Sequence, residues 1–342
     1  MNENLVLVGA RTTKERDARG KGLTLWDASK SEWRLLDTLP MTNPSWITAG
    51  RDSTYYVLHG DGGEVSTVGI SEKRRIVHRQ TIDCLGMNPV HAAVTDDERL
   101  IIANYATGTV AAFNIDSDGT LQRNGKVIYL AEQYLNRFPS EGNQFSHPHQ
   151  ILILPDRHKI LVPDKGLDAL FVIDIEGEDL LVIDIVRTKP GSGPRHAAIS
   201  PDFPDAVYVV GELDATLMHY RLAQNNKLEL LGSCSTLPPG QVLDNMSAAG
   251  ITIAGAHVLV SNRGHDSIAV FSIDHGGYPT RSSVVDAGGA FPRFIALRAD
   301  SLVIAHERSD TIAVAALDPA LGLKVPTIAA RTGSPVCVQP VL

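Results

Sequence analysis

The chain has 342 residues, of which 43% are hydrophobic and 20% are charged, and its formal net charge at pH 7 is −8. This composition is typical of a soluble globular protein. The acidic balance argues against a nucleic-acid partner, because a phosphate backbone favours a basic face. No apolar run reaches the length that crosses a bilayer, so no membrane partner is expected.

The cysteines and the N-terminal residues bear on the compartment. Cys84, Cys234 and Cys337 are odd in number and far apart, which disfavours a disulfide framework or a zinc knuckle. Leu5–Ala10 is a short apolar run without the basic region of a signal peptide. We therefore expect a cytoplasmic protein.

One pattern recurs along the chain: a short apolar run, a turn, and a second apolar run that ends on polar residues. In the stretch from Gly193 to Leu222, the turn at Pro201–Asp205 separates two such runs of strand length. The first runs begin at residues 44, 89, 148, 194, 248, 292 and 335. A repeat of roughly 40–50 residues is typical of the four-stranded blade of a β-propeller. The sequence predicts an all-β, seven-bladed β-propeller that occupies residues 1–342 as one domain.

Each end of the chain carries part of a blade. Leu5–Gly9 and Gly22–Asp27 have the pattern of a second and a third strand without a first strand before them. Val336–Val338 has the pattern of a first strand with nothing after it. Joining them in one blade closes the ring and removes the open edges of a linear array. The alternative is two unrelated terminal strands.

Two connections between blades are long and have no clear pattern of their own. They are Ala131–Ser146 and Ser235–Ser247, and each leads into a first strand. Both are therefore expected on the same face of the disc. Long loops are often functional, so they form either a rim around a site or tolerated surface insertions.

The starts of the first strands and the ends of the second strands are expected on one face, around the central channel. In the hairpin that turns at Phe203, Arg195 is expected opposite Gly211 and beside Glu212. The other blades bring further polar and charged side chains to this face: Trp46, His59, His91, Asn104, Tyr105, His149, Asp164, Lys165, His196, Asn262, Arg263, Arg293, His306 and Glu307.

Four cations in this set predict a pocket that attracts anions, because guanidinium groups match carboxylates and phosphates: Arg195, Arg263, Arg293 and Lys165. Glu212 and His149 are candidates for a general base or acid, because burial and neighbouring charges tune both residue types toward neutral pH. A purely structural interpretation of these residues also stays open. In it, Arg195 and Glu212 form an ion pair that stabilises the fold, and His149 forms hydrogen bonds at a strand end.

Other kinds of site find little support in the sequence. His147 and His149 are alternate residues of one strand and point to opposite faces, which disfavours a metal site. Three further polar residues are interpreted as groups that form hydrogen bonds at blade ends rather than as catalysts: His196, Asn104 and Asp164. The chain has no G-x-S-x-G elbow, no P-loop and no G-x-G-x-x-G motif. We therefore expect neither a metal nor a cofactor.

Several segments together resemble the lactonase family of seven-bladed propellers, which includes 6-phosphogluconolactonases: His147–His149, Gly193–His196, Ser247–Ala249, Ser261–Ile268 and Pro292–Arg293. The resemblance covers essentially the whole chain and is most specific from about His147 to Val270. It implies a metal-free site in the central cleft. The matching positions are His149, Arg195, Glu212 and Arg263 as catalytic residues, with Arg293 as a further anion binder.

Three positions on the same face depart from the family pattern. Gly250 stands where the family usually has an acidic residue, Gly211 replaces an Asn before the matching glutamate, and His306-Glu307 stands where Asn-Gln is common. We assign His196, Asp164, Lys165, His306 and Glu307, with Arg293, to substrate binding.

The resemblance implies the hydrolysis of an anionic sugar lactone, 6-phosphogluconolactone, in the pentose phosphate pathway of carbohydrate metabolism. The expected partner is this small anionic lactone. Arginines would hold the anion and the oxyanion, while Glu212 or His149 acts as the base. Two alternatives stay open: a lyase that closes a carboxymuconate to a lactone, as a fungal member of the family does, and a non-catalytic propeller that binds proteins.

Overall fold

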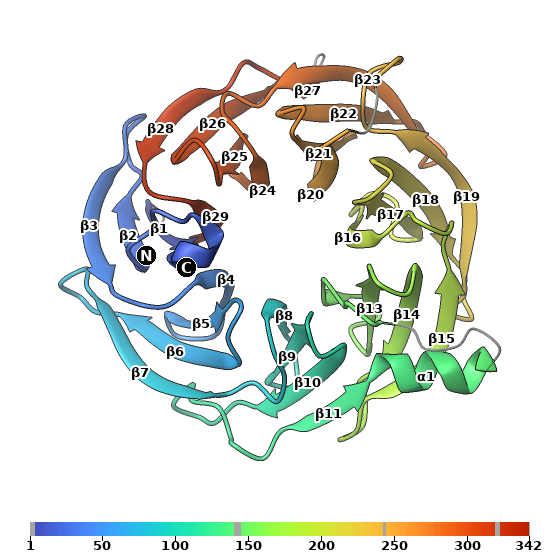
Figure 1. Cartoon of the computed structure of the whole chain (residues 1–342), viewed down its shortest axis with the longest axis horizontal. Coiled ribbons are helices and arrows are strands. Elements are labelled where there is room, and N and C mark those ends of the chain that lie inside the picture. Colours follow the sequence, from blue (N-terminus) through green and yellow to red (C-terminus); the bar gives the residue numbers. More distant parts are fainter. Residues whose placement is uncertain (1–3, 140–144, 242–243, 319–321, 342) are drawn as a thin grey trace.

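The computed structural model describes residues 4–139, 145–241, 244–318 and 322–341. Its strands form seven antiparallel sheets arranged as blades around a central axis (Figure 1). The predicted seven-bladed β-propeller is confirmed. Among the described residues, no helix is long and apolar enough to cross a membrane.

Six blades take their strands in chain order from the axis outward. Blade 1 has β4 (Pro44–Ala49), β5 (Thr54–His59), β6 (Glu64–Ile70) and β7 (Ile76–Asp83). Blade 2 has β8 (Pro89–Val94), β9 (Arg99–Asn104), β10 (Thr109–Asn114) and β11 (Lys126–Tyr129). Blade 3 has β12 (Leu152–Ile153), β13 (Lys159–Asp164), β14 (Ala169–Asp174) and β15 (Leu181–Arg187).

The next three blades follow the same plan. Blade 4 has β16 (Pro194–Ile199), β17 (Ala206–Gly211), β18 (Thr216–Leu222) and β19 (Leu228–Ser235). Blade 5 has β20 (Ser247–Ala254), β21 (His257–Arg263), β22 (Ser267–Ile273) and β23 (Pro279–Asp286). Blade 6 has β24 (Pro292–Arg298), β25 (Ser301–His306) and β26 (Thr311–Asp318), and both β27 (Gly322–Leu323) and β28 (Thr327–Arg331) pair with β26.

The closing blade is built from both ends of the chain. Its order from the axis is β29 (Pro335–Pro340), β1 (Leu5–Ala10), β2 (Leu23–Asp27) and β3 (Arg34–Leu39). In the register of β1 against β29, Val8 pairs with Val338. The predicted ring closure is therefore confirmed, and unrelated terminal strands are excluded.

The hydrophobic core lies between neighbouring blades. Second strands such as β17 are buried along their whole length, because an adjacent blade covers each face. Outer strands such as β15 instead alternate exposed and partly buried residues. The buried side chains fall into seven clusters among the described residues, and each cluster joins two adjacent blades. Packing therefore runs around the ring without a break, including the joints on both sides of the closing blade.

Each inner strand carries one extra residue near its start. Pro194 pairs with Gly211, but His196 pairs with Val210, so Arg195 has no partner opposite it. The expected pairing of Arg195 with Gly211 was therefore wrong by one residue. A one-residue shift occurs at the matching place in all seven blades. Such a β-bulge redirects side chains, and here two successive residues, Arg195 and His196, both line the central pocket.

The two long connections differ from each other. Residues Leu130–Arg137 form the helix α1, which was not predicted, and it packs Leu130 and Tyr134 into the core between blades 2 and 3. These two side chains are four residues apart and lie on one helix face. Residues 140–144 of this connection and 242–243 of the other lie outside the described residues. The described part of the second connection, after β19, has no helix or strand.

Candidate functional site

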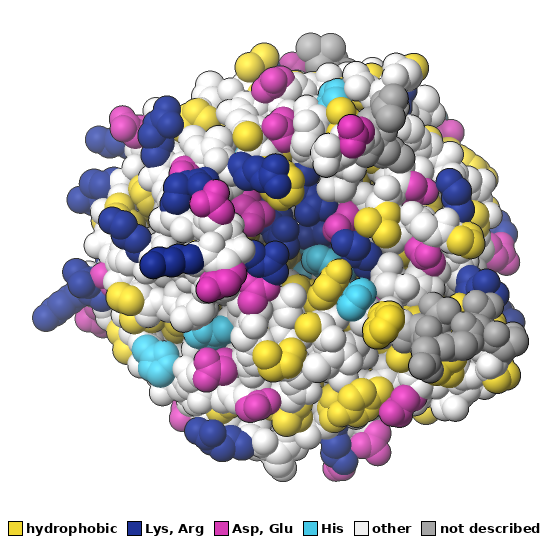
Figure 2. All heavy atoms as spheres, viewed as in Figure 1, with side chains coloured by type: hydrophobic (Ala, Val, Ile, Leu, Met, Phe, Trp, Pro, Cys, Tyr) yellow, Lys and Arg dark blue, Asp and Glu magenta, His cyan; other side chains and the backbone are white. Residues whose placement is uncertain are grey.

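A pocket opens at the centre of the disc, on the face where the inner strands begin. Figure 2 shows a hollow near the centre of this face in which Lys, Arg and His side chains gather. Most of the lining comes from the bulged residue of each inner strand and the residues just after it: Ser45, Trp46, Val90, His149, Gln150, Arg195, His196, Gly250, Ile251, Arg293, Phe294, Ile295 and Val336, with Arg11 from the closing blade. The repeated bulge therefore supplies the pocket with its chemistry.

A layer of aromatic rings lies one residue further along the inner strands. The ring centroids of Trp46 and His91 are 4.0 Å apart, and those of Trp46 and Phe294 are 5.8 Å apart. His196 lies 5.6 Å from His91 and 5.2 Å from His149. These rings pack against one another, so the pocket has an aromatic floor made of imidazoles as well as Trp46 and Phe294.

The imidazoles around this floor are held neutral. Burial lowers the pKa of His149 and of His196 well below 6.5, and the charge of Arg195 lowers both further. Burial, with Arg195, lowers the pKa of His91 to about 3. Nδ1 of His149 and Nε2 of His196 are buried without a hydrogen-bond partner. His149 therefore combines a neutral ring at pH 7, an unpaired nitrogen and a place in the pocket wall.

Glu212 lies directly after β17 and gathers three cations. Its Oε2 is 2.8 Å from Nε of Arg195 and 3.2 Å from Nη2 of Arg263, and its Oε1 accepts a hydrogen bond from Lys165. Burial alone would raise the pKa of Glu212, but Arg263, Arg195 and Lys165 outweigh it and hold this pKa far below its ordinary range. Glu212 is therefore a permanent carboxylate and a weak base.

The arginines beside Glu212 are also attached to the main chain. Arg195 donates from Nη1 to the carbonyl of Ala249 at 2.8 Å, and Arg263 donates from Nη2 to the carbonyl of Ala248 at 3.0 Å. Burial lowers the pKa of Arg195 to about 9, against the opposing charge of Glu212. Arg195 lines the pocket, whereas Arg263, Lys165 and Glu212 stand behind it. The contact between Arg195 and Glu212 is confirmed, and Glu212 fixes this arginine in place.

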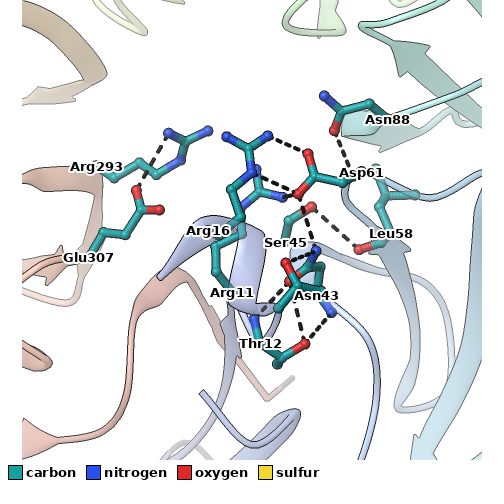
Figure 3. A network of polar contacts seen from close by, with 11 residues as sticks. Arg11, Thr12, Arg16, Asn43, Ser45, Leu58, Asp61, Asn88, Arg293 and Glu307 are labelled. Carbon is teal, nitrogen blue, oxygen red and sulfur yellow. Dashed lines mark hydrogen bonds and ion pairs between the residues drawn. The ribbon is translucent and has the colours of Figure 1, made fainter. Parts of the chain in front are cut away.

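A second charged cluster lies where the closing blade meets blades 1 and 6, and sequence reasoning missed its members Arg11, Arg16 and Asp61. Arg11 follows β1, is only 3% exposed and donates from Nη1 to Asp61 Oδ2 at 3.1 Å. Arg16, in the short 3-10 helix Lys14–Arg16, donates from Nε to the same oxygen at 2.9 Å. Figure 3 shows these two guanidinium groups and that of Arg293 turned toward one another between Asp61 and Glu307.

Two residues assigned to substrate binding lie inside the blades. Asp164 is completely buried, and its carboxylate accepts hydrogen bonds from Ser146 Oγ and from the main-chain N–H groups of residues 147, 166 and 167. His306 is also completely buried, with contacts to Thr311 Oγ1 and to the carbonyl of Ala287. The structure therefore does not bring them into the pocket, because each satisfies main-chain and side-chain groups at the end of a second strand.

The remaining predicted residues lie at the pocket or next to it. Arg293 and His196 line it, and Glu307 lies 3.5 Å from Arg293 Nη1 through its Oε2. In the part of the chain that the structure describes, no three His, Cys, Asp or Glu side chains are grouped as metal ligands. The geometry offers buried guanidinium groups, which suit the binding of an anion, and neutral imidazoles, which have a nitrogen able to accept a proton.

Fold and site together define a seven-bladed propeller with an arginine-rich central pocket. The chain belongs to the family described as lactonase, 7-bladed beta-propeller, which matches residues 5–340. The resemblance noted in the sequence is thereby confirmed at the level of the family.

Relatives and solved structures agree with this membership. The chain is 30% identical to the 6-phosphogluconolactonase of Bacillus subtilis over 73% of each chain, and 28% identical to an uncharacterized protein of Lactococcus lactis over 90% of each. Its structure is similar to that of the periplasmic gluconolactonase of Pseudomonas aeruginosa, with a TM-score of 0.86, 24% identity and 99% of each chain covered. At that identity the structural likeness supports the fold alone.

Proposed function

We propose that the protein hydrolyses the lactone of an anionic sugar acid, with 6-phosphogluconolactone as substrate. The observation that carries this proposal is the neutral, unpaired imidazole of His149 in the same pocket as the guanidinium groups of Arg195 and Arg293. A base beside anion-binding groups is what the opening of an anionic ester requires. Membership of the lactonase family and the name of the Bacillus subtilis relative support the same reaction.

In the proposed reaction, water attacks the lactone carbonyl carbon while His149 takes one of its protons. The negative charge that develops on the carbonyl oxygen is stabilised by Arg195, which is already held in place and needs no reorganisation. The bond from the carbonyl carbon to the ring oxygen then breaks, and the imidazolium returns its proton to that oxygen. The new carboxylic acid ionises, so one water is consumed and one proton is released.

The two base candidates differ in their surroundings and in their access to the pocket. Glu212 is surrounded by Lys165, Arg195 and Arg263, so a proton on its carboxylate is strongly disfavoured. His149 instead lines the pocket and has an unpaired Nδ1, and its ring is neutral at pH 7 because burial, Arg195, Arg293 and Lys165 all lower its pKa. We therefore assign the base to His149 and give Glu212 the role of positioning Arg195.

Proton release from freshly generated 6-phosphogluconolactone tests the proposal, after spontaneous opening has been subtracted. His149→Gln is expected to lower kcat by about 10²–10⁴-fold, the usual contribution of a general base. His158→Gln, on an exposed turn, is the matched control and should keep wild-type activity. If the wild-type enzyme does not exceed the blank, the sugar-phosphate assignment is wrong, and carboxymuconates are the next substrates to try.

We also propose a cytoplasmic location. Cys84, Cys234 and Cys337 are all unpaired in the structure, which supports a reducing compartment. Cell fractionation tests this, and recovery with periplasmic markers would contradict it.

A further inference from the structure

One side-chain amide joins the two blades that carry the proposed base and the proposed oxyanion group. Gln150 directly follows His149 in blade 3 and is only 9% exposed. Its Oε1 accepts a hydrogen bond from the main-chain N–H of Ala197 at 2.5 Å, and its Nε2 donates to the carbonyl of the same residue at 3.2 Å. Ala197 belongs to β16 of blade 4, two residues after Arg195. The amide therefore spans the joint between the base and the oxyanion group.

The edge that this amide binds has no strand beside it. No described strand of one blade pairs with a strand of another, and β16 is the innermost strand of its own sheet. The N–H and C=O of Ala197 that face blade 3 therefore need partners from elsewhere, because burying such groups unpaired is costly. Gln150 supplies a donor and an acceptor together, as an added strand would.

The two partners also fix the orientation of the amide. A flipped amide would set its nitrogen against the N–H of Ala197 and its oxygen against the carbonyl, so both hydrogen bonds would be lost. At the joints on either side, the side-chain links between inner segments are single: Ile151 N–H donates to His91 Nδ1 at 3.3 Å, and Arg195 Nη1 donates to the carbonyl of Ala249 at 2.8 Å. A two-point link resists both sliding and tilting of one blade against the other, which a single hydrogen bond does not.

Both ends of the link are tied to the proposed reaction centre. His149 donates its main-chain N–H to the carbonyl of Pro163 at 2.9 Å, so it moves with blade 3. Arg195 is fixed on the other side by Glu212 and by the carbonyl of Ala249. The distance from base to oxyanion group therefore depends on the spacing of the two blades. A displacement of reacting groups by about 1 Å can cost about 100-fold in rate.

We propose that Gln150 is a positioning residue that sets the separation of His149 and Arg195, and with it the rate of the chemical step. This inference rests on the proposed lactonase function and adds a residue to its machinery. Gln150 also lines the pocket, but its Oε1 and one N–H of its amide are occupied by Ala197. Direct contact of the second N–H with the substrate is the alternative that the test separates.

The chain contains a matched control. Gln80, on the outer strand β7 of blade 1, makes the same pair of hydrogen bonds to blade 2: its Oε1 accepts from the N–H of Leu121 at 2.9 Å, and its Nε2 donates to the carbonyl of Leu121 at 3.0 Å. The residues that line the central pocket do not include it. Gln80→Met and Gln150→Met therefore remove equivalent links between blades, one at the outer strand and one beside the site.

Steady-state kinetics on 6-phosphogluconolactone compare both variants with wild type. Gln150→Met is expected to lower kcat by about 10- to 100-fold and to change KM by less than about 3-fold, because the link acts on the chemical step rather than on binding. Gln80→Met should keep both constants. Gln150→Ser leaves room for water to reach Ala197, which keeps the protein folded even if Gln150→Met is not, and the same loss is expected.

NMR of isotope-labelled histidine separates positioning from direct contact with the substrate. The imidazole signal of His149, identified by its absence in His149→Gln, is expected to be single in wild type and Gln80→Met and to broaden or split in Gln150→Met. An unchanged kcat, a loss carried by KM, an equal loss in Gln80→Met or an unchanged His149 signal would each overturn the positioning role while the lactonase proposal stands. If wild type opens no lactone, the proposed function fails, and the same NMR comparison still tests whether Gln150 holds His149 in place.

Discussion

Glu212 and Asp61 each hold arginine side chains at the central pocket, but their surroundings differ. Glu212 is 7% exposed, and two of its cations are also attached to main-chain carbonyls. Asp61 has a side chain that is 29% exposed, and among the described residues neither of its arginines donates to a main-chain carbonyl. The arginines around Glu212 are held in fixed positions by the protein itself, and the electrostatic field that they create is therefore fixed as well. In the arrangement around Asp61, the guanidinium of Arg11 makes no further hydrogen bond within the described residues.

The largest expected effect is the loss of stability when Glu212 is replaced. Glu212→Gln leaves three buried or half-buried cations without their counter-ion, and it is expected to lower the free energy of unfolding by about 3–5 kcal/mol. Urea unfolding followed by circular dichroism measures this. Glu229→Gln, in an exposed ion pair with Arg221, should leave the midpoint unchanged. A loss below about 1 kcal/mol for Glu212→Gln would show that Glu212 does not hold these cations in place.

The second expected effect is acid sensitivity that arises from the buried imidazole of His91 beneath the pocket. The pKa of His91 is lowered to about 3 by burial and by Arg195. Because the unfolded chain then binds the proton first, stability is complete above pH 6.5 and falls as the pH decreases toward 3. One such histidine contributes a slope of about 1.4 kcal/mol per pH unit in that range.

Urea unfolding between pH 7 and pH 5 measures this slope before most carboxylates titrate. His91→Gln is expected to reduce the slope by the contribution of one histidine, whereas exposed His158→Gln should not change it. An unchanged slope in His91→Gln would mean that this imidazole does not stay neutral in the folded state.

The smallest expected effect is the loss of stability when Asp61 is replaced. Asp61→Asn keeps an acceptor oxygen for Arg16 and Arg11 at a half-exposed position, so the free energy of unfolding should fall by no more than about 1 kcal/mol. The same urea unfolding curves measure it. A loss as large as that of Glu212→Gln would remove the contrast between the two carboxylates.

The sequence predicted the architecture well because each blade repeats the same two-strand signal. The starts of the first strands at Pro44, Pro89, Pro194, Pro292 and Pro335 are each the first residue of a strand in the structure. Ring closure followed from the incomplete patterns at the two ends of the chain. Pairing positions were less accurate, because counting residues from the turn at Phe203 cannot detect the bulge at Arg195.

The site was predicted in part. The contact of Arg195 with Glu212 followed from strand ends that share one face. Arg11 follows the second strand of the closing blade, as Glu212 does in blade 4, so the same rule extended past Gly9 would have found it. The inward turn of Asp164 and His306 depends on hydrogen bonds to nearby turns and connections, which strand patterns do not encode.

The closure of the ring has a consequence for biosynthesis. β29, the last of the described strands to be synthesised, is the inner partner of β1, the first of them. The pocket takes Arg11 from the beginning of the chain and Val336 from its end. A nascent chain that does not yet contain β29 therefore lacks a complete pocket, so binding competence arises only after this strand has been synthesised and has paired with β1.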